Sequence, residues 1–344
     1  MKISALTPGI DVPSSKYRIR QYIPTLADSG IFVNEFPAKI DYSAKLPGVL
    51  GRVRQKYIFP VSASWIGIKA LSRISDVIQC NQYDAIWLNR AIVSSVFMER
   101  LLTKPLIYDV DDAIWLNNEK KIGKIARKAT VILAGNSFIA EWFRKINSNV
   151  QIIPTAIDTK WFCPGESASD NVFRIVWTGT HQTMHYLLSI EKVLAKFLNE
   201  RKDALLLVIS DFPPIFRIIS QEKVKFIKWT PEDELKALQG ASVGIMPLFD
   251  SPWESGKCSF KMLKYMACGI PVLVSPVGMN KEVLSKGEIG LSAINDEEWI
   301  SGLDFLFYNP DKCKQMGLKG IQVVKNFYSL DNVSEKLVRI IRNI

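Results

Sequence analysis

The sequence predicts an α/β protein made of two similar-sized Rossmann-like halves. Its 344 residues are too many for one ordinary hydrophobic core. Short apolar runs alternate with helical patterns twice along the chain, and a polar link at residues 164–170 separates the two sets. We therefore expect an N-terminal domain at residues 1–160 and a C-terminal domain at residues 170–331.

The first half is expected to form a parallel sheet with helices between its strands. Its short apolar runs predict strands at Lys2–Leu6, Ile31–Glu35, Ala85–Leu88, Leu106–Asp109, Val131–Ala134 and Val150–Ile153. Between them, helical patterns occupy Tyr17–Leu26, Val93–Leu102 and Ser137–Asn147.

The second half repeats this organisation. Strands are expected at Phe173–Trp177, Ala204–Ile209, Val224–Ile227, Val243–Met246 and Val272–Ser275. The C-terminal segment, residues 332–344, is expected to be a helix, because Val333, Leu337, Ile340 and Ile341 would share one face.

The composition is that of a soluble globular protein in a reducing compartment. Apolar residues make up 48% of the chain and charged residues 23%, and no apolar run is long enough to span a bilayer. The first residues resemble a strand rather than a signal peptide. Five cysteines without a CxxC or Cys/His cluster favour the cytoplasm and give no metal site.

The positive charge is concentrated in the first half. Residues 1–160 carry 22 Lys and Arg against 13 Asp and Glu, whereas residues 161–344 carry 22 against 21. Such asymmetry predicts an anionic partner for the first domain. No nucleic-acid motif is present, so an anionic membrane surface is the preferred partner, met peripherally by the mixed basic and aromatic segments Gly51–Pro60 and Trp65–Lys69. The alternative is a solvated helix face beside core aromatic residues.

The segment Trp253–Gly278 carries the strongest local signal for ligand binding. It combines a polar loop, a short helix, a Gly-Ile-Pro stop, a buried strand and a glycine turn. The unpaired N–H groups of a helix N-terminus favour anions, and Lys257 and Ser259 flank such a terminus. We expect this segment to bind a diphosphate, with Lys257 as its main cation and Lys261 as a second. For Lys261 the alternative is a solvent-facing helix lysine.

A second part of the same site is expected where the first strand of the second half ends. Gly179 has no Cβ and lets a ligand approach the backbone closely, and Thr180 and His181 follow it. His181 is interpreted as a contact to a diphosphate or sugar, and His185 as structural. Cations at a departing diphosphate stabilise the transition state more than the ground state.

Acidic residues close the fourth predicted strand of the first half. Asp109, Asp111 and Asp112 allow three interpretations: a metal site for a diphosphate, a contact from Asp111 or Asp112 to an acceptor hydroxyl, or an N-cap by Asp112. The metal site is the weakest, because the later lysine-containing segment already accounts for a diphosphate.

The first strand–helix loop of the basic half is a further candidate for ligand contact. It contains a Thr-Pro-Gly turn that ends at Gly9, and Arg18 follows. Arg18 is expected either to reach a phosphate or to lie on a helix surface.

Five segments, in this order, resemble the GT-B glycosyltransferases of family four, the retaining "group 1" sugar transferases. They are Tyr108–Trp115, Ala134–Phe138, Ile153–Thr159, Val176–Thr180 and Trp253–Gly278. The resemblance implies an acceptor-binding N-terminal half, a nucleotide-sugar-binding C-terminal half, and a last helix, residues 332–344, that packs back on the first domain. It also implies metal-free, retaining transfer of a hexose-type sugar to a glycan or lipid-linked acceptor in surface polysaccharide or lipopolysaccharide synthesis.

The residues expected at the site follow from these motifs. The catalytic candidates are Lys257, His181 and Asp111; the donor-binding candidates are Gly179, Thr180, Glu254, Ser259, Phe260, Lys261, Lys264 and Gly278; the acceptor-side candidates are Gly9, Arg18 and Asp112.

One residue departs from the family pattern. Lys264 stands where the family has a glutamate that accepts hydrogen bonds from the nucleotide ribose, and a lysine side chain has no acceptor. Either Glu254 supplies the carboxylate or ribose recognition differs. This departure keeps a non-catalytic nucleotide- or glycan-binding relative or scaffold open as an alternative. A nucleotide-sugar epimerase is a third possibility, because it shares the two-domain architecture, but no acid/base set for that reaction is found in the sequence.

Overall fold

The computed structural model describes residues 1–41, 44, 59–165 and 170–344. The chain forms two compact units. The first contains residues 1–156, 256–258 and 333–344, and the second contains residues 157–255 and 259–332. Most of the basic and aromatic segment at residues 51–60, and residues 166–169 of the polar link, lie outside the described residues.

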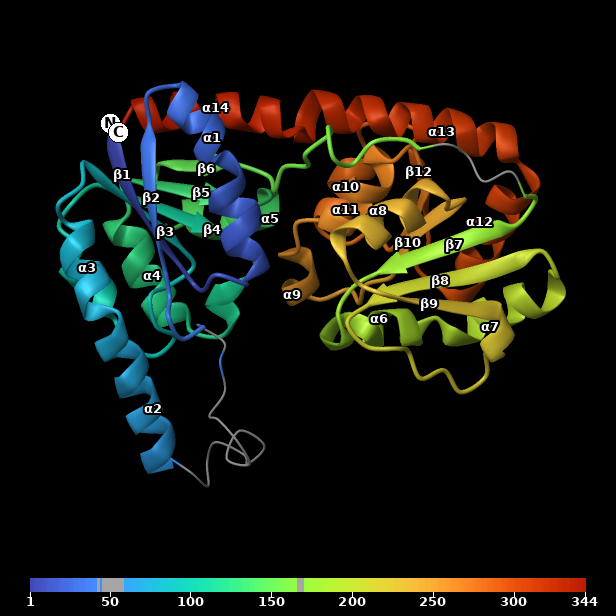
Figure 1. Cartoon of the computed structure of the whole chain (residues 1–344), viewed down its shortest axis with the longest axis horizontal. Helices are drawn as coiled ribbons and strands as arrows, with labels where there is room; N and C mark the ends of the chain where they lie inside the picture. Colours follow the sequence, from blue (N-terminus) through green and yellow to red (C-terminus); the bar gives the residue numbers. More distant parts are fainter. Residues whose placement is uncertain (42–43, 45–58, 166–169) are drawn as a thin grey trace. The chain divides into compact units, whose positions relative to one another are not determined.

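The first unit contains a six-stranded parallel sheet in the order β2-β1-β3-β4-β5-β6 (Figure 1). Its strands are β1 Lys2–Thr7, β2 Phe32–Pro37, β3 Ala85–Asn89, β4 Leu106–Val110, β5 Val131–Ala134 and β6 Val150–Ile152. Strands β3, β4 and β5 are buried along their whole length, which explains why they read as continuous apolar runs. The six strands expected in this half are therefore confirmed to within two residues.

Helices of the first unit connect these strands. They are α1 Ile23–Asp28, α2 Phe59–Ser72, α3 Ile74–Cys80, α4 Glu119–Lys128 and α5 Ser137–Arg144. The helical stretch predicted at Tyr17–Leu26 is confirmed, but it is divided into a π-helical turn at Ser15–Ile19, a 3-10 turn at Arg20–Tyr22 and then α1. Pro24 at the start of α1 has no N–H to continue the preceding turns.

The helix predicted at Val93–Leu102 is wrong. Only the 3-10 turn Met98–Leu101 forms there. The ammonium group of Lys121 on α4 donates to the carbonyl oxygens of Val93 and Val96, at 2.8 Å from the latter. Glu99 accepts from the backbone N–H of Ile92 at 2.9 Å. Side chains thus bind two carbonyl groups of this segment and the N–H group of the residue before it, which a continuous helix would have paired within the backbone.

The second unit contains another six-stranded parallel sheet, in the order β12-β11-β10-β7-β8-β9. Its strands are β7 Phe173–Thr178, β8 Ala204–Ser210, β9 Val224–Lys228, β10 Val243–Met246, β11 Val272–Val274 and β12 Gly290–Ser292. The five strands expected here are confirmed, and β12 is an addition that the sequence did not reveal, since it has only three residues and none of them is buried.

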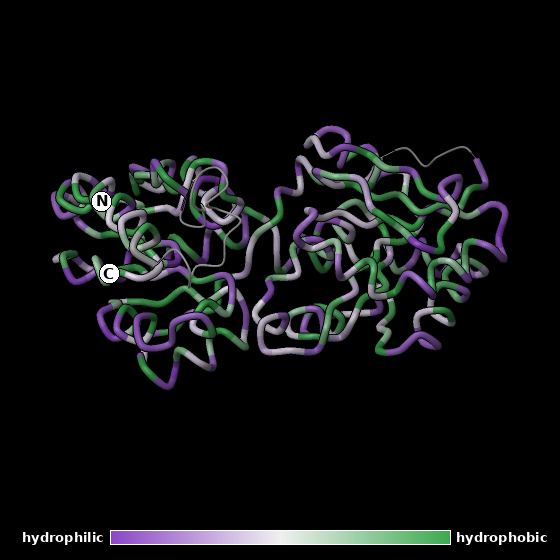
Figure 2. The backbone as a smooth tube through the Cα atoms, turned by 90° about the horizontal axis from the view of Figure 1, so that it is seen from below, coloured by the Kyte–Doolittle hydropathy of each residue, from purple (hydrophilic) through white to green (hydrophobic). Residues whose placement is uncertain are grey.

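Nine helices are seen in the second half of the described chain. They are α6 Met184–Ser189, α7 Glu191–Glu200, α8 Pro231–Gln239, α9 Pro252–Ser255, α10 Phe260–Ala267, α11 Met279–Leu284, α12 Asp296–Tyr308, α13 Pro310–Val323 and α14 Leu330–Arg342. The core of the second unit joins Trp177, Phe197, Leu206 and Trp299, which come from β7, α7, β8 and α12. Hydrophobic stretches recur along the backbone of both units (Figure 2).

The end of α14 belongs to the first unit. The ammonium group of Lys336 donates to the carbonyl oxygen of Ile152 on β6 at 2.7 Å, and the guanidinium of Arg342 donates to that of Ser29 at 3.0 Å. Among the described residues, no helix is both long and apolar enough to cross a bilayer.

Candidate donor and acceptor sites

In the second unit, the loop after β7 is shaped by Gly179. A Cβ atom there would lie 2.4 Å from the indole ring of Trp177 and 2.7 Å from the hydroxyl oxygen of Thr183, so no side chain fits. Thr180 and Thr183 form a capping box, in which the Thr183 hydroxyl accepts from the Thr180 N–H at 3.1 Å. The loop is therefore held close to the carboxyl end of β7, the edge where α/β sheets bind ligands.

His181, at the tip of this loop, is oriented by Asp211 after β8. Its backbone N–H donates to one carboxylate oxygen of Asp211 at 2.6 Å, and its ring Nδ1 lies 2.5 Å from the other. Desolvation opposes ionisation of this carboxyl, but the bonds from His181 lower the pKa of Asp211 to about 2. Both side chains are exposed, so the other ring nitrogen of His181 is available to a ligand.

Helix α10 places a lysine against the same loop. Ser259 precedes the helix with a left-handed backbone (φ 49°), and its hydroxyl donates to Asn280 at 2.6 Å. Phe260 is the first residue of the helix. The Lys261 ammonium lies 4.4 Å from the centre of the Trp177 ring and 3.5 Å from the Thr183 hydroxyl. Lys261 is therefore not simply solvated, and it lies beside the loop that contains Gly179.

Lys264, three residues further along α10, is buried against a carboxylate that the sequence did not single out. Its ammonium pairs with Glu234 on α8, and both side chains are less than a tenth exposed. Glu234 also accepts from the Thr178 hydroxyl at 2.6 Å and from the indole N–H of Trp229 at 3.2 Å. Burial raises the pKa of this carboxyl, but Lys264 and the two other donors hold it below its usual value.

The carboxylate that the sequence offered as a substitute, Glu254 on α9, is engaged elsewhere. It is buried and accepts from the hydroxyl groups of Tyr186 and Ser251. Gly278, before α11, has φ 51°, and a Cβ there would lie 2.5 Å from the carbonyl oxygen of Ser255. Both residues thus shape the loop before α10, and a direct ligand contact stays a prediction for each.

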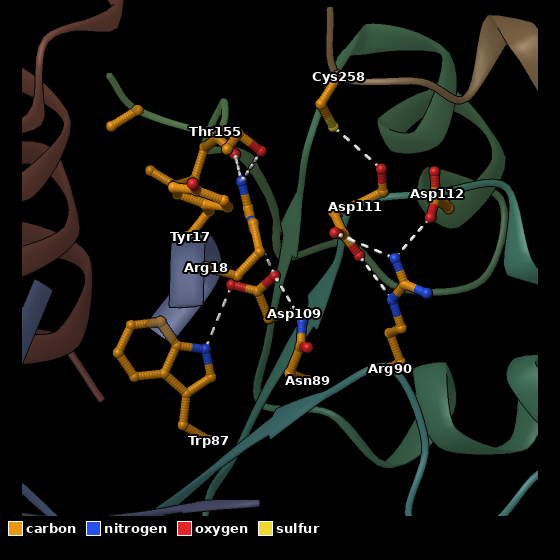
Figure 3. Close-up of polar contacts among 12 residues, drawn as sticks. Tyr17, Arg18, Trp87, Asn89, Arg90, Asp109, Asp111, Asp112, Thr155 and Cys258 are labelled. Atoms are coloured by element: carbon orange, nitrogen blue, oxygen red, sulfur yellow. Dashed lines mark hydrogen bonds and ion pairs between the residues drawn. The ribbon is translucent and has the colours of Figure 1, made fainter. Parts of the chain in front are cut away.

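In the first unit, Arg18 lies in the interior and not on a helix surface, so that alternative is wrong. Its side chain is 0% exposed and donates to Asp109 at 2.8 Å and to the carbonyl oxygen of Ile153 at 2.7 Å (Figure 3). Asp109 also accepts from the indole N–H of Trp87 at 3.3 Å. Arg18 therefore joins the first helical turns to the ends of β4 and β6, and a phosphate contact by it stays a prediction.

Arg90, at the end of β3, holds the other two aspartates. Its guanidinium donates to Asp111 at 2.9 Å and to Asp112 at 2.5 Å, and its backbone is left-handed, with φ 65° (Figure 3). The N-cap role considered for Asp112 is wrong, because the following turn, Ile114–Leu116, has no side-chain cap. Burial and the neighbouring charge of Asp111 raise the pKa of Asp112 above its ordinary value, although Arg90 and the nearby charge of Lys257 act to lower it.

Lys257 lies in the short segment Gly256–Cys258, which groups with the first unit. The side-chain amide of Asn136 donates to the Lys257 carbonyl oxygen at 3.0 Å. Gly9 is buried, and a Cβ there would lie 3.0 Å from Val12 and 3.1 Å from Asp41. Among the described residues, no cluster of three His, Cys, Asp or Glu side chains could hold a metal ion.

Known proteins resemble the chain in sequence and in three-dimensional structure. Residues 173–308 match the family described as "Glycosyl transferases group 1". The α-1,3/1,6-mannosyltransferase alg-2 of Neurospora crassa is 26% identical over 164 residues, which cover 46% of this chain and only 30% of that protein.

Two solved structures superpose over the whole chain. HepE of Anabaena in complex with UDP-glucose has a TM-score of 0.73 at 13% identity, with 100% of both chains covered. Sucrose-phosphate synthase of Thermosynechococcus elongatus has a TM-score of 0.71 at 16% identity, covering 100% of this chain and 99% of that one. At such identities the likeness shows the fold.

These matches agree with the family that the five motifs indicate, and they support glycosyltransferase as the enzyme class. Residues 173–308 belong to the group 1 glycosyltransferases, and the chain as a whole has the two-domain GT-B fold.

Proposed function

We propose that this protein transfers a hexose-type sugar from a nucleoside diphosphate sugar to a hydroxyl of a glycan or lipid-linked acceptor, with retention of anomeric configuration and without a metal. One observation carries the proposal. Lys261, in the first turn of α10, lies 3.5 Å from Thr183 in the loop that begins at Gly179. Two motifs about eighty residues apart thereby place a cation, a side-chain-free backbone and a helix N-terminus together in the family-matched part of the chain.

The chemistry follows from the charge of the leaving group. As the bond to the anomeric carbon breaks, negative charge develops on the departing diphosphate. The Lys257 and Lys261 ammonium groups and the first N–H groups of α10 would stabilise that charge more in the transition state than in the ground state. His181, whose Nδ1 is held by Asp211, would present its other ring nitrogen to the diphosphate or the sugar, as a hydrogen-bond acceptor when the ring is neutral and as a donor when both nitrogens carry a proton. The acceptor hydroxyl would be oriented by Asp111 or Asp112.

The proposal extends to the cellular setting of the reaction. The net charge of +9 in residues 1–160 supports contact with an anionic membrane surface and a lipid-linked acceptor. Assembly of a surface polysaccharide or lipopolysaccharide on the cytoplasmic face of a membrane would supply such an acceptor.

The donor is tested with a panel of UDP- and GDP-sugars. HepE of Anabaena was solved with UDP-glucose and the fungal relative is a mannosyltransferase, so glucose and mannose donors come first. Mass spectrometry of product formed on simple glycosides and on lipid-linked sugars detects transfer. Binding of nucleotide without transfer to any acceptor would instead favour the non-catalytic alternative.

Lys257→Ala tests the cation assignment. Loss of a charge-assisted bond to the diphosphate should raise the dissociation constant of UDP or GDP by about tenfold to 100-fold in calorimetry. Lys225→Ala, which changes an exposed lysine on β9, is the matched control and should have no effect. Unchanged nucleotide affinity in Lys257→Ala would remove Lys257 from the site.

A further inference from the structure

The segment Gly256–Cys258 is held in a fitted recess of the first unit. The thiol of Cys258 donates to the carbonyl oxygen of Asp111 at 3.0 Å (Figure 3). A Cβ on Gly135 would lie 2.4 Å from the Cys258 sulfur, so the thiol occupies the space that any side chain at position 135 would need. The fit depends on a glycine at one position and a small side chain at the other.

Gly256 and Lys257, the two residues before Cys258, are also held against the first unit. A Cβ on Gly256 would lie 2.7 Å from the Cβ and the backbone nitrogen of Ala113, so this glycine allows the segment to approach the Asp111–Ala113 loop. The Lys257 carbonyl oxygen accepts from Asn136 at 3.0 Å. Three successive residues are thus held in place: Gly256 by the close approach of its backbone to Ala113, Lys257 by a hydrogen bond to its carbonyl oxygen, and Cys258 by its thiol.

The side chain of Asn136 makes two hydrogen bonds with different roles. Its side-chain oxygen caps α5 by accepting from the backbone N–H of Ile139 at 2.9 Å, and its nitrogen donates to Lys257. The side chain is buried, which keeps this second bond from being exchanged for one with water.

We propose that Cys258 and Asn136 are positioning residues for Lys257: they fix its main chain in the recess formed by Gly135, Asp111 and Ala113, and so hold its ammonium where the leaving diphosphate needs it. This inference rests on the proposed function for the role of Lys257, but the recess itself can be tested without substrate. A displacement of about 1 Å in a group that stabilises the transition state can cost about 100-fold in rate.

Asn136→Asp tests the inference with little change in shape. Asp is as good a helix cap as Asn, so α5 should keep its start. The carboxylate, however, cannot donate to the Lys257 carbonyl and would repel it. We expect kcat to fall by about tenfold to 100-fold, and by more than the dissociation constant of the nucleotide rises, with little change in melting temperature.

The same substitution in a Lys257→Ala background shows whether Asn136 acts through the lysine. If it does, Asn136→Asp/Lys257→Ala should have the activity of Lys257→Ala alone, because effects transmitted through one group are not additive. An undiminished further loss in the double variant would overturn the inference.

A size exchange tests the recess directly. Gly135→Ala should lower kcat/KM by about tenfold or more, since its Cβ would overlap the Cys258 sulfur. Gly135→Ala/Cys258→Ala removes this overlap and should recover part of that loss, but only part, because the bond from the Cys258 thiol to Asp111 is lost as well. The new Cβ would also lie 3.2 Å from the Asp111 Cα, which limits the recovery further. A double variant as impaired as Gly135→Ala would contradict the recess.

The rate at which N-ethylmaleimide alkylates Cys258 measures, without any substrate, how firmly the segment is held in the recess. Burial raises the pKa of this thiol to about 12, so labelling of the wild type should be slow. Asn136→Asp should accelerate it about tenfold by loosening the segment, while Cys313 in the same sample keeps its rate. Unchanged labelling of Cys258 would refute the inference; faster labelling in a protein that binds no nucleotide would refute only the proposed function.

Discussion

Arg18–Asp109 in the first unit and Lys264–Glu234 in the second are both buried ion pairs near the carboxyl end of a sheet, but the pKa values of their two carboxylates are shifted in opposite net directions. Arg18 and Asp109 in the first unit are 0% and 1% exposed, and Lys264 and Glu234 in the second are 8% and 3% exposed. Burial raises the pKa of Asp109 above its ordinary value in spite of its arginine partner, whereas the pKa of Glu234 is lowered.

The difference comes from the remaining donors and charges. Glu234 accepts from Lys264, from Thr178 at 2.6 Å and from Trp229 at 3.2 Å. Besides Arg18, the donors to Asp109 among the described residues are Trp87 at 3.3 Å and Asn89 at 3.5 Å, both longer bonds, and Asp109 is repelled by Asp111. A buried carboxylate is thus stabilised by the full set of donors around it and not by its ion-pair partner alone.

Removal of the arginine should cause the largest loss of stability. Arg18→Met leaves Asp109 buried with two long hydrogen bonds, and breaking a buried pair on one side typically costs roughly 3–5 kcal/mol. Denaturant unfolding should show a loss of this size in the free energy of unfolding. Arg18→Met/Asp109→Asn, which also removes the stranded charge, should recover about half of it. A loss below about 1 kcal/mol in the single variant would mean that the pair is open to water.

Removal of the lysine should cost less. Lys264→Met leaves Glu234 with the Thr178 and Trp229 donors, so we expect a loss of roughly 1.5–3 kcal/mol at pH 7, the range for a hydrogen bond to a charged group. Because the folded-state pKa of Glu234 is depressed, its stabilising contribution is present above the unfolded value of about 4.3 and is lost as the pH falls below it.

The pH dependence distinguishes this pair from an ordinary packing defect. In Lys264→Met, desolvation without the ammonium should raise the pKa of Glu234, so the stability gap to wild type should be largest near pH 7 and shrink as the pH falls toward about 4. In Lys264→Met/Glu234→Gln the gap should be almost independent of pH. A gap in Lys264→Met that stays constant between pH 7 and pH 4 would argue that Glu234 is already protonated in the wild type.

The comparison also shows which parts of the fold the sequence could predict. Strands buried on both faces, such as β4 and β8, appear as continuous apolar runs and could be placed within a residue or two. The segment Val93–Leu102 could not be placed, since Lys121, from another part of the chain, binds two of its carbonyl groups. A pattern in local sequence carries no information about such a partner.

The same limit applies to the candidate site. Lys264 stood out because it departs from the family pattern, but its partner Glu234 lies in Thr-Pro-Glu-Asp-Glu, which indicates only a helix start with acidic residues in its first turn. Arg18 could equally have lain on a helix surface, because one arginine in a helical pattern does not reveal Asp109, 91 residues later. Motifs therefore located the segments, and tertiary packing decided what each charged group contacts.

The smallest effect is expected for the exposed counterpart of these pairs, His181 and Asp211. Their side chains are 54% and 39% exposed, so Asp211→Asn should change the free energy of unfolding by less than about 1 kcal/mol at pH 7. The pKa of Asp211 is lowered to about 2, so any stabilisation by its charge is present above about pH 3.9 and fades as the pH falls toward 2. Thermal melts of both proteins in low and high salt should therefore differ little, and 1 M salt should reduce even that difference. A larger loss that salt does not reduce would place this pair with the buried ones, and would mean that the loop after β7 is shielded from water before any ligand binds.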